Sequence, residues 1–143
     1  MNTELARKAA DYALESGGNI KFDLKTWNEE LNVALCGMSN RPALENFAML
    51  AEKFYDKRPE LPILSASTLL VPGYVDSEEV GNIAKYISEI NADVPYTLLA
   101  FYPYHVMNDL PTTSRSQAEQ CLQVARKHLK RVRLGNVHLL SGR

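Results

Sequence analysis

The chain has 143 residues, of which 45% are hydrophobic and 23% are charged, and these values are typical of one globular domain rather than of a disordered segment. Sixteen basic residues stand against seventeen acidic ones, so no overall positive field favours nucleic acid or an anionic membrane as a partner. No apolar run reaches the roughly eighteen residues that span a bilayer, and residues 1–7 lack the apolar core of a secretory signal.

The first half of the chain predicts a helix, a strand and two further helices. Apolar residues at helical spacing predict a first helix over 4–15, after which two glycines end it. A strand is expected over 20–25. A short helix is expected over 28–35, and a longer amphipathic helix runs from about residue 40 to residue 57, with a proline in its first turn.

The second half continues the alternation. An extended run over 63–71 predicts a second strand, and acidic residues from Asp76 onward are typical of the start of a helix that reaches about residue 90. A third strand is expected over 95–102. Ser114 then caps a last helix that runs to about Lys130.

We also expect a short fourth strand near 137–140. Regular alternation of helices and strands favours parallel strands joined by right-handed helical crossovers. The predicted fold class is therefore α/β, as a single domain over 1–143 with three to four parallel strands. So few strands cannot close a barrel of the usual eight. The chain is then either part of a (β/α) barrel or a small open sheet with helices on one side.

Charged residues alternate with apolar ones in the first predicted strand. Lys21, Asp23 and Lys25 face one side of the strand, because successive side chains point to opposite faces. Burying such charges is costly unless they meet each other, water or a ligand. The strand is therefore expected to line a pocket, although a structural ion pair between Asp23 and Lys25 is the alternative.

Ligands of parallel α/β folds lie at the carboxyl ends of the strands. Asp23 and Lys25 mark the first such end, residues 72–74 with Gly73 mark the second, and residues 102–105 with His105 mark the third. An acid, a base, an imidazole and a glycine that allows close approach suit a polar ligand with hydroxyl or amino acid groups. The alternatives are a loop histidine bonded to backbone and a glycine that serves only a turn.

The two cysteines and one basic run also bear on function. Cys36 and Cys121 form no Cys-x-x-Cys pair, which favours a reducing, cytoplasmic location and two small buried side chains. The basic run over 126–133 lies at a predicted helix end, where the helix dipole favours cations. We therefore interpret this run as a solvated helix end and expect no nucleic-acid partner and no membrane partner.

Four segments of the chain form a recognisable series, IKFDLKTW at 20–27, LCGMSN at 35–40, TLLVPGYVD at 68–76 and FYPYH at 101–105. In this order they resemble the second half of radical S-adenosylmethionine enzymes, and within that family the activating enzymes of pyruvate formate-lyase. The resemblance implies a radical SAM barrel of about six strands in its complete form, built like a TIM barrel.

The resemblance also implies cofactors and contacts. S-adenosylmethionine and a [4Fe-4S] cluster would lie at the carboxyl ends of the strands, and a glycyl-radical enzyme or another protein would be the substrate. Asp23 and Lys25 match an Asp-x-Lys motif at the amino acid part of S-adenosylmethionine, and His105 matches a histidine near the nucleoside. A carboxylate accepts hydrogen bonds from an ammonium and a lysine pairs with a carboxylate, so these roles fit the side chains.

The chain departs from this family at the cluster. The family holds the cluster with three cysteines in a C-x3-C-x2-C loop, and no such spacing occurs here. Ser65 and Ser67 stand where the pyruvate formate-lyase activating enzymes place an arginine. We therefore expect a carboxyl-terminal half-barrel without the cluster-binding half, with no catalytic residue and no metal ligand of its own.

Such a half-barrel has two origins and two functions to consider. It is either a domain of a longer oxidoreductase or the product of a shortened gene, and alone it should not cleave S-adenosylmethionine reductively. The alternative function is a cluster-free binding or interaction module. Such a module would form a homodimer or pair with a partner through its open barrel edge.

Overall fold

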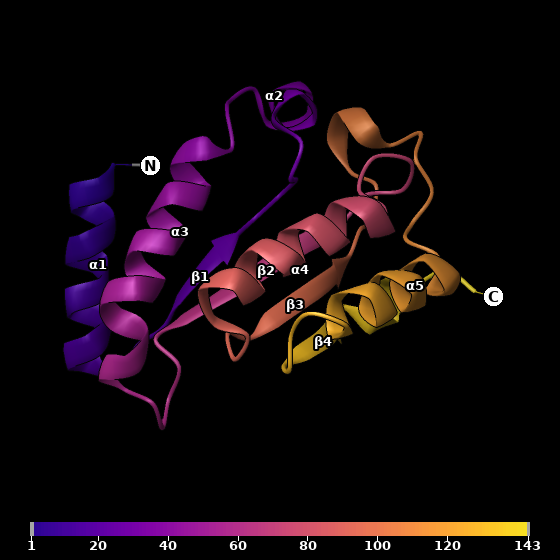
Figure 1. Cartoon of the computed structure of the whole chain (residues 1–143). Coiled ribbons are helices and arrows are strands. Elements are labelled where there is room, and N and C mark those ends of the chain that lie inside the picture. Colours follow the sequence, from indigo (N-terminus) through magenta and orange to yellow (C-terminus); the bar gives the residue numbers. More distant parts are fainter. Residues whose placement is uncertain (1, 143) are drawn as a thin grey trace.

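The computed structural model describes residues 2–142 and shows helices and strands in alternation (Figure 1). The elements are α1 (Thr3–Ser16), β1 (Ile20–Asp23), α2 (Glu29–Cys36), α3 (Arg41–Phe54), β2 (Leu64–Leu70), α4 (Ser77–Asn91), β3 (Tyr96–Ala100), α5 (Arg115–Arg126) and β4 (Val132–Gly135). Short 3₁₀ helices lie at Tyr55–Lys57, His105–Met107 and Val137–Leu139.

The four strands form one sheet in the order β1-β2-β3-β4, and every neighbouring pair is parallel. This arrangement confirms the predicted α/β class and the parallel crossovers. The register places Asp23 beside Ser67, Ser67 beside Thr97, and Thr97 beside Arg133. One row of polar residues therefore crosses the whole sheet.

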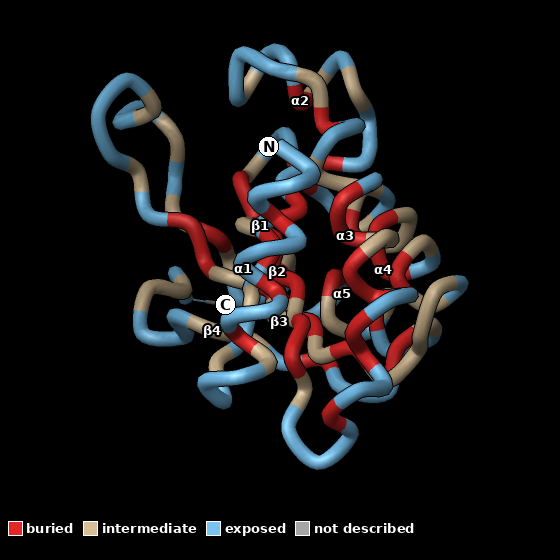
Figure 2. The backbone as a smooth tube through the Cα atoms, turned by 90° about the vertical axis from the view of Figure 1, so that its left-hand side faces the viewer, coloured by how far each residue is buried: buried red, intermediate tan, exposed pale blue. Residues whose placement is uncertain are grey.

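The helices leave one face of this sheet uncovered. In Figure 2 the helices α3, α4 and α5 lie together on one side of the strands, and α1 packs beside α3 near the β1 edge. Burial follows the same division, since Phe22 and Leu24 are buried while Lys21 and Asp23 are exposed. The charged side chains of β1 thus point away from the helices, as their alternation predicts.

The core lies between the sheet and these helices. The apolar stripe of α4 is fully buried at Val80, Ile83, Ala84 and Ile87, and this helical spacing keeps all four side chains on one face. Asp76 caps the start of α4. Its side chain accepts hydrogen bonds from the backbone N–H groups of Glu78 and Glu79.

Buried polar side chains tie the end of β1 to the core. The Tyr96 hydroxyl donates to Thr68 Oγ1 over 2.7 Å, and the Thr68 hydroxyl donates to the carbonyl oxygen of Leu24 over 2.6 Å. Burial raises the pKa of Tyr96 well above its usual value, so this phenol stays a hydrogen-bond donor. The network holds the backbone between Asp23 and Lys25 in place.

A buried arginine closes the carboxyl end of α1. The Arg58 guanidinium donates to the carbonyl oxygens of Ala13, Gly18 and Leu61, so it satisfies backbone acceptors that the helix end leaves open. The turn after α1 is thereby joined to the loop before β2.

The predicted last strand was wrong in position. The fourth strand is β4 at Val132–Gly135, and Val137–Leu139 forms a 3₁₀ helix instead. The α5 helix ends at Arg126, and the backbone N–H of Lys130 bonds to Ala92 rather than to its own helix. The basic residues that suggested a longer helix alternate with Val132 along β4, where the neighbouring strand β3 supplies the partners.

Within residues 2–142, no helix combines the length and the hydrophobicity that crossing a lipid bilayer requires.

Candidate functional site at the carboxyl ends of the strands

Asp23 is the last residue of β1 and lies on the open face of the sheet. Its carboxylate accepts a hydrogen bond from the hydroxyl of Ser67, which is 1% exposed. The Asp23 side chain itself keeps 49% of its surface exposed. A fixed carboxylate with water on one side can accept a further hydrogen bond from a ligand.

Two lysines flank this carboxylate. The Lys25 ammonium lies 3.7 Å from one carboxylate oxygen of Asp23, and the Lys21 ammonium lies 3.9 Å from the other. The Lys25 side chain is 47% exposed, so the pair is open to solvent rather than enclosed in the protein. Exposed pairs of this kind contribute little to stability, and both groups stay available to a ligand.

Asp23 and Lys25 together line a pocket of about 170 Å³. The rest of its wall comes from the loop after β1 and from residues of α2 and α3. Its volume is below that of a whole drug-sized site, so it suits one part of a larger ligand.

A buried polar framework shapes this pocket. The Thr26 hydroxyl donates to the carboxamide oxygen of Asn32 over 3.1 Å, and Asn32 donates to the carbonyl oxygen of Met38 over 2.8 Å. Asn40 donates to the carbonyl oxygens of Thr26 and Trp27. None of these three side chains was predicted as a site residue from the sequence. Asn40 directly precedes α3, and its side chain bonds to the loop after β1 instead of capping the helix.

A second pocket adjoins the first one. It has a volume of about 220 Å³, and Lys25 and Cys36 line both pockets. Its other walls are apolar and include Leu69, Val71 and Phe101. Both pockets therefore offer apolar surface next to the charged Lys25 side chain, and Asp23 adds a carboxylate to the first one.

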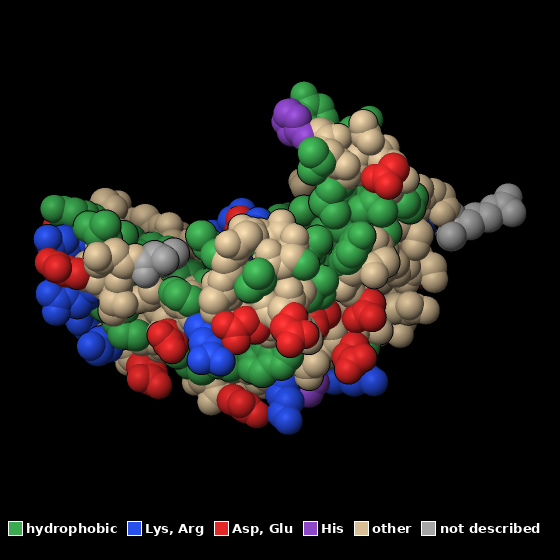
Figure 3. All heavy atoms as spheres, turned by 90° about the horizontal axis from the view of Figure 1, so that it is seen from above, with side chains coloured by type: hydrophobic (Ala, Val, Ile, Leu, Met, Phe, Trp, Pro, Cys, Tyr) green, Lys and Arg blue, Asp and Glu red, His purple; other side chains and the backbone are tan. Residues whose placement is uncertain are grey.

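The segment between β3 and α5 projects beyond the open side of the sheet (Figures 1 and 2). Viewed from above in Figure 3, it stands beside the concave side of the molecule and carries many hydrophobic side chains, among which Tyr102, Tyr104 and Val106 are exposed. His105 belongs to this segment, is exposed, and has a positive φ of 54°. Its ring meets Tyr104 edge to face at 4.5 Å.

The structure brings Asp23 and Lys25 together but does not bring His105 to them. His105 is absent from the walls of both pockets, whereas Met107 of the same segment lines the apolar one. Gly73 has a φ of +81° and no atom within 4 Å of the place where a Cβ would stand. The positive φ explains the glycine at this turn, because residues with a side chain rarely adopt that conformation.

The two cysteines differ in their surroundings. Cys36 is exposed at the end of α2, contrary to the expected burial, and Cys121 is buried in α5. Burial raises the pKa of Cys121 to about 11. Among residues 2–142, no three His, Cys, Asp or Glu side chains gather as a metal site requires.

A parallel sheet with an ion pair and an apolar pocket at the ends of its strands defines an α/β protein with a candidate ligand site. No family model matches the chain. Isethionate sulfite-lyase activating enzyme from Desulfovibrio desulfuricans is 38% identical over 93 residues, which cover 62% of this chain and 28% of that protein. A putative glycyl-radical enzyme activating enzyme from Methanocaldococcus jannaschii is 26% identical over 113 residues, which cover 79% of this chain and 42% of that protein.

The fold has a counterpart among solved structures. A domain of pyruvate-formate lyase-activating enzyme from Bacteroides vulgatus superposes with a TM-score of 0.69 over 91% of this chain and 74% of that chain, at 20% identity. This likeness shows the fold alone, whereas the two relatives above are similar in sequence. The chain is similar in sequence to activating enzymes of this kind, so the resemblance to radical S-adenosylmethionine activating enzymes is confirmed. The chain spans less than half the length of the two curated relatives.

Proposed function

We propose that this chain is the carboxyl-terminal part of a radical S-adenosylmethionine activating enzyme for a glycyl-radical protein, and that it contributes cofactor and substrate contacts. The observation that carries this proposal is the Asp23–Lys25 pair at the end of β1, held by Ser67 and open to two adjoining pockets. The partial coverage of the relatives supports the assignment to one part of the enzyme.

The residues present fit the amino acid part of S-adenosylmethionine. The Asp23 carboxylate would accept from the ammonium of the cofactor, and the Lys25 ammonium would pair with its carboxylate. The apolar pocket beside Lys25 would receive the next part of the ligand, near the segment that carries His105. When bound to a cluster, S-adenosylmethionine supplies radical chemistry, and the part of this chain would be binding and orientation.

The residues present do not fit the [4Fe-4S] cluster. The chain has two cysteines, one exposed beside the pockets and one buried in the core, while a cluster of this family takes three thiolates. We therefore propose that the cluster belongs to another part of the enzyme. We also propose a cytoplasmic location, because a reducing compartment keeps two such cysteines as free thiols.

The proposal is tested by calorimetric titration of the chain with S-adenosylmethionine. We expect binding with a dissociation constant of about 1 mM or tighter. Asp23→Asn and Lys25→Gln should each weaken binding about tenfold, because each removes a charge-assisted contact. Circular dichroism verifies that both variants are folded.

Lys21→Gln is the matched control. Lys21 is also a lysine beside the Asp23 carboxylate, but it lines neither pocket. Its removal should leave binding within about twofold of the parent chain. Absence of binding, or equal weakening by Lys21→Gln and Lys25→Gln, would contradict the assigned site.

A second candidate function is an interaction module without cluster chemistry. It is favoured by the β1 edge, which pairs only with β2 among residues 2–142, and by the open face of the sheet. A second copy or a protein partner would then cover this edge. Sedimentation at about 0.1 mM tests the homodimer, and a purely monomeric chain at that concentration would speak against it.

A further inference from the structure

A second polar pocket lies at the opposite end of the sheet, where the strands begin. It has a volume of about 640 Å³, within the usual range of roughly 300–1,000 Å³ for small-molecule sites. Asn19 precedes β1, Pro62 precedes β2, and Pro95 precedes β3, and all three line it together with the segment that leads into β4. The pocket therefore shares no residue with the Asp23–Lys25 site.

Positive charge is concentrated around this pocket. Arg126, Lys130, Arg131 and Arg133 line it, and no Asp or Glu does. Lys130 is paired with Asp93 at 3.2 Å, whereas the three arginines appear in none of the ion pairs of the described residues. Four cations around one pocket repel each other in a chain whose net charge is −1, and an anion would offset that repulsion.

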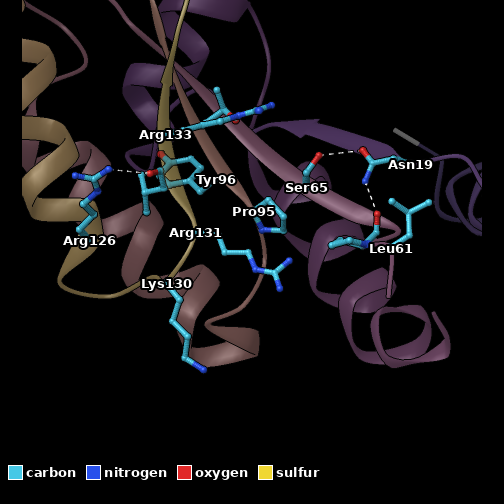
Figure 4. A pocket seen from close by; sticks show the side chains of 12 residues that line it. Asn19, Leu61, Ser65, Pro95, Tyr96, Arg126, Lys130, Arg131 and Arg133 are labelled. Carbon is cyan, nitrogen blue, oxygen red and sulfur yellow. Dashed lines mark hydrogen bonds between the residues drawn. The ribbon is translucent and has the colours of Figure 1, made fainter. Parts of the chain in front are cut away.

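Two of the arginines are aimed across the pocket. Arg133 belongs to β4, and Arg131 directly precedes this strand, where its carbonyl oxygen accepts from the Tyr96 N–H. The two arginines are two residues apart along this extended segment, so their side chains leave the backbone on the same face. Figure 4 shows both extending toward the side where Ser65 and Asn19 lie, with Pro95 between them. The Nε group of Arg133 donates to Thr97 Oγ1 over 3.2 Å, which orients the guanidinium and leaves its two terminal nitrogens for a ligand.

Hydroxyl and amide groups complete the wall opposite the arginines. The Ser65 hydroxyl donates to the carboxamide oxygen of Asn19 over 3.0 Å, and the carboxamide nitrogen of Asn19 donates to the carbonyl oxygen of Pro62 over 2.8 Å. A hydroxyl can rotate to donate to an incoming anion instead. Leu61 and Pro95 add apolar surface beside these groups.

We propose that this pocket binds a small organic anion that carries a phosphate group. The planar guanidinium groups of Arg131 and Arg133 present paired donors that match the oxygens of a phosphate. The volume greatly exceeds the roughly 30 Å³ that a water molecule occupies in the liquid, so an organic part fits beside the phosphate against Leu61 and Pro95.

The same arrangement disfavours nucleic acid as the ligand. Lys127 and His128 belong to the same basic run but do not line the pocket. The cations therefore converge on one concavity and do not form a continuous track for a phosphate backbone.

The test is calorimetric titration of the chain with inorganic pyrophosphate at about 0.15 M ionic strength. We expect saturable binding to one site. Arg131→Gln and Arg133→Gln should each weaken it by about tenfold or more, and Arg131→Lys should weaken it less than Arg131→Gln, since the charge remains and the fork is lost. Ser65→Ala gives a third, independent measure and should weaken binding a few-fold.

Lys127→Gln is the matched control, because it removes one charge from the same run outside the pocket. It should leave pyrophosphate binding unchanged. No saturation at about 10 mM pyrophosphate, or equal weakening by Lys127→Gln and Arg131→Gln, would overturn the proposal. Tighter binding of a single-stranded DNA oligonucleotide than of pyrophosphate, weakened equally by both of these variants, would overturn it in favour of a nucleic-acid surface.

Discussion

At the scale of single residues, Asp23 and Lys25 form an ion pair that is held in place but contributes little to the stability of the protein. Asp23 is held by a buried hydroxyl, yet about half of its side chain and of Lys25 remains in water. Solvent screens such a pair, so its contribution to the free energy of unfolding is about 0–1 kcal/mol. Substitutions there therefore report on ligand binding rather than on folding.

We expect Cys36 and Cys121 to react with a thiol reagent at different rates. At about pH 8 the exposed Cys36 should react within minutes, while Cys121 should stay unmodified until the chain unfolds, because burial raises its pKa to about 11 and blocks access. Mass spectrometry of the peptides after labelling with iodoacetamide measures both sites. Native-state labelling of Cys121 at the rate of Cys36 would contradict this burial.

The raised pKa of Cys121 also makes the free energy of unfolding depend on pH. The native thiol keeps its proton up to a pKa of about 11, whereas its ordinary value is 9.0, so the native state binds more protons between these values. The free energy of unfolding attributable to this group therefore falls as pH rises from about 9 to about 11.

At the scale of elements, the segment between β3 and α5 is exposed at its tip but anchored at its base. The Thr113 hydroxyl, which is fully buried, accepts from the backbone N–H of Phe101 and donates to the carbonyl oxygen of Leu70, each over 2.7 Å. One side chain thus joins the ends of β2 and β3 to the start of α5. The position of the apolar pocket, which Phe101 lines, depends on this contact.

Replacing that side chain should loosen the segment. Thr113→Val keeps the shape but leaves the Phe101 N–H and the Leu70 carbonyl without this partner, so we expect a loss of about 2–4 kcal/mol in the free energy of unfolding. Amide hydrogen exchange at Phe101 should become faster. Urea unfolding and hydrogen exchange measure the two effects.

Thr112→Val is the control for that experiment. Thr112 is the neighbouring threonine and is only partly buried, so its replacement should change the free energy of unfolding by about 0.5 kcal/mol or less. Equal losses in the two variants would show that the Thr113 hydroxyl does not anchor the segment.

At the scale of the whole molecule, the sheet has two ends with different chemistry. The carboxyl ends carry an acid between two lysines beside an apolar pocket, and the amino ends carry a pocket lined by four cations. The face between them is left open by the helices. The molecule therefore has two separate candidate ligand sites, which share no lining residue and can be tested by independent mutations.

The chain as a whole should not assemble a cluster. After anaerobic reconstitution with iron and sulfide, we expect no [4Fe-4S] absorbance, and incubation with S-adenosylmethionine and dithionite should release no 5′-deoxyadenosine. The reason is that two cysteines, one of them buried, cannot supply three thiolates. A full complement of bound iron with product formation would contradict the division of labour that we propose.

Sequence reasoning succeeded where one local pattern decided the structure. The stripe of α4 at Val80, Ile83 and Ile87 and the cap at Ser114 needed only helical spacing and a hydroxyl that accepts from the Gln117 N–H. It failed for β4, because the basic run favours a solvated helix end locally. Val132 and Arg133 become strand residues only when β3 offers hydrogen-bond partners.

The residues of the candidate site likewise include some that the sequence predicts and some that only the structure reveals. Alternation along β1 was sufficient to place Asp23 and Lys25 on the open face, since the period of a strand is two. Thr26, Asn32 and Asn40 could not be found, because their hydrogen bonds join the loop after β1 to α2 and α3. The sequence does not indicate how far His105 lies from Asp23 and Lys25. The path of the projecting segment decides that His105 lines neither pocket.

The order of helices and strands, the parallel class of the sheet and the charged face of β1 were therefore determined by the sequence itself, through periodicity and capping that act within a few residues. The tertiary structure alone decided that Ser67 meets Asp23, that Thr113 binds both Leu70 and Phe101, and that cations before and within β4 converge with Asn19 on one pocket. These contacts join residues far apart in the chain, and only the register of four parallel strands brings them within hydrogen-bond distance.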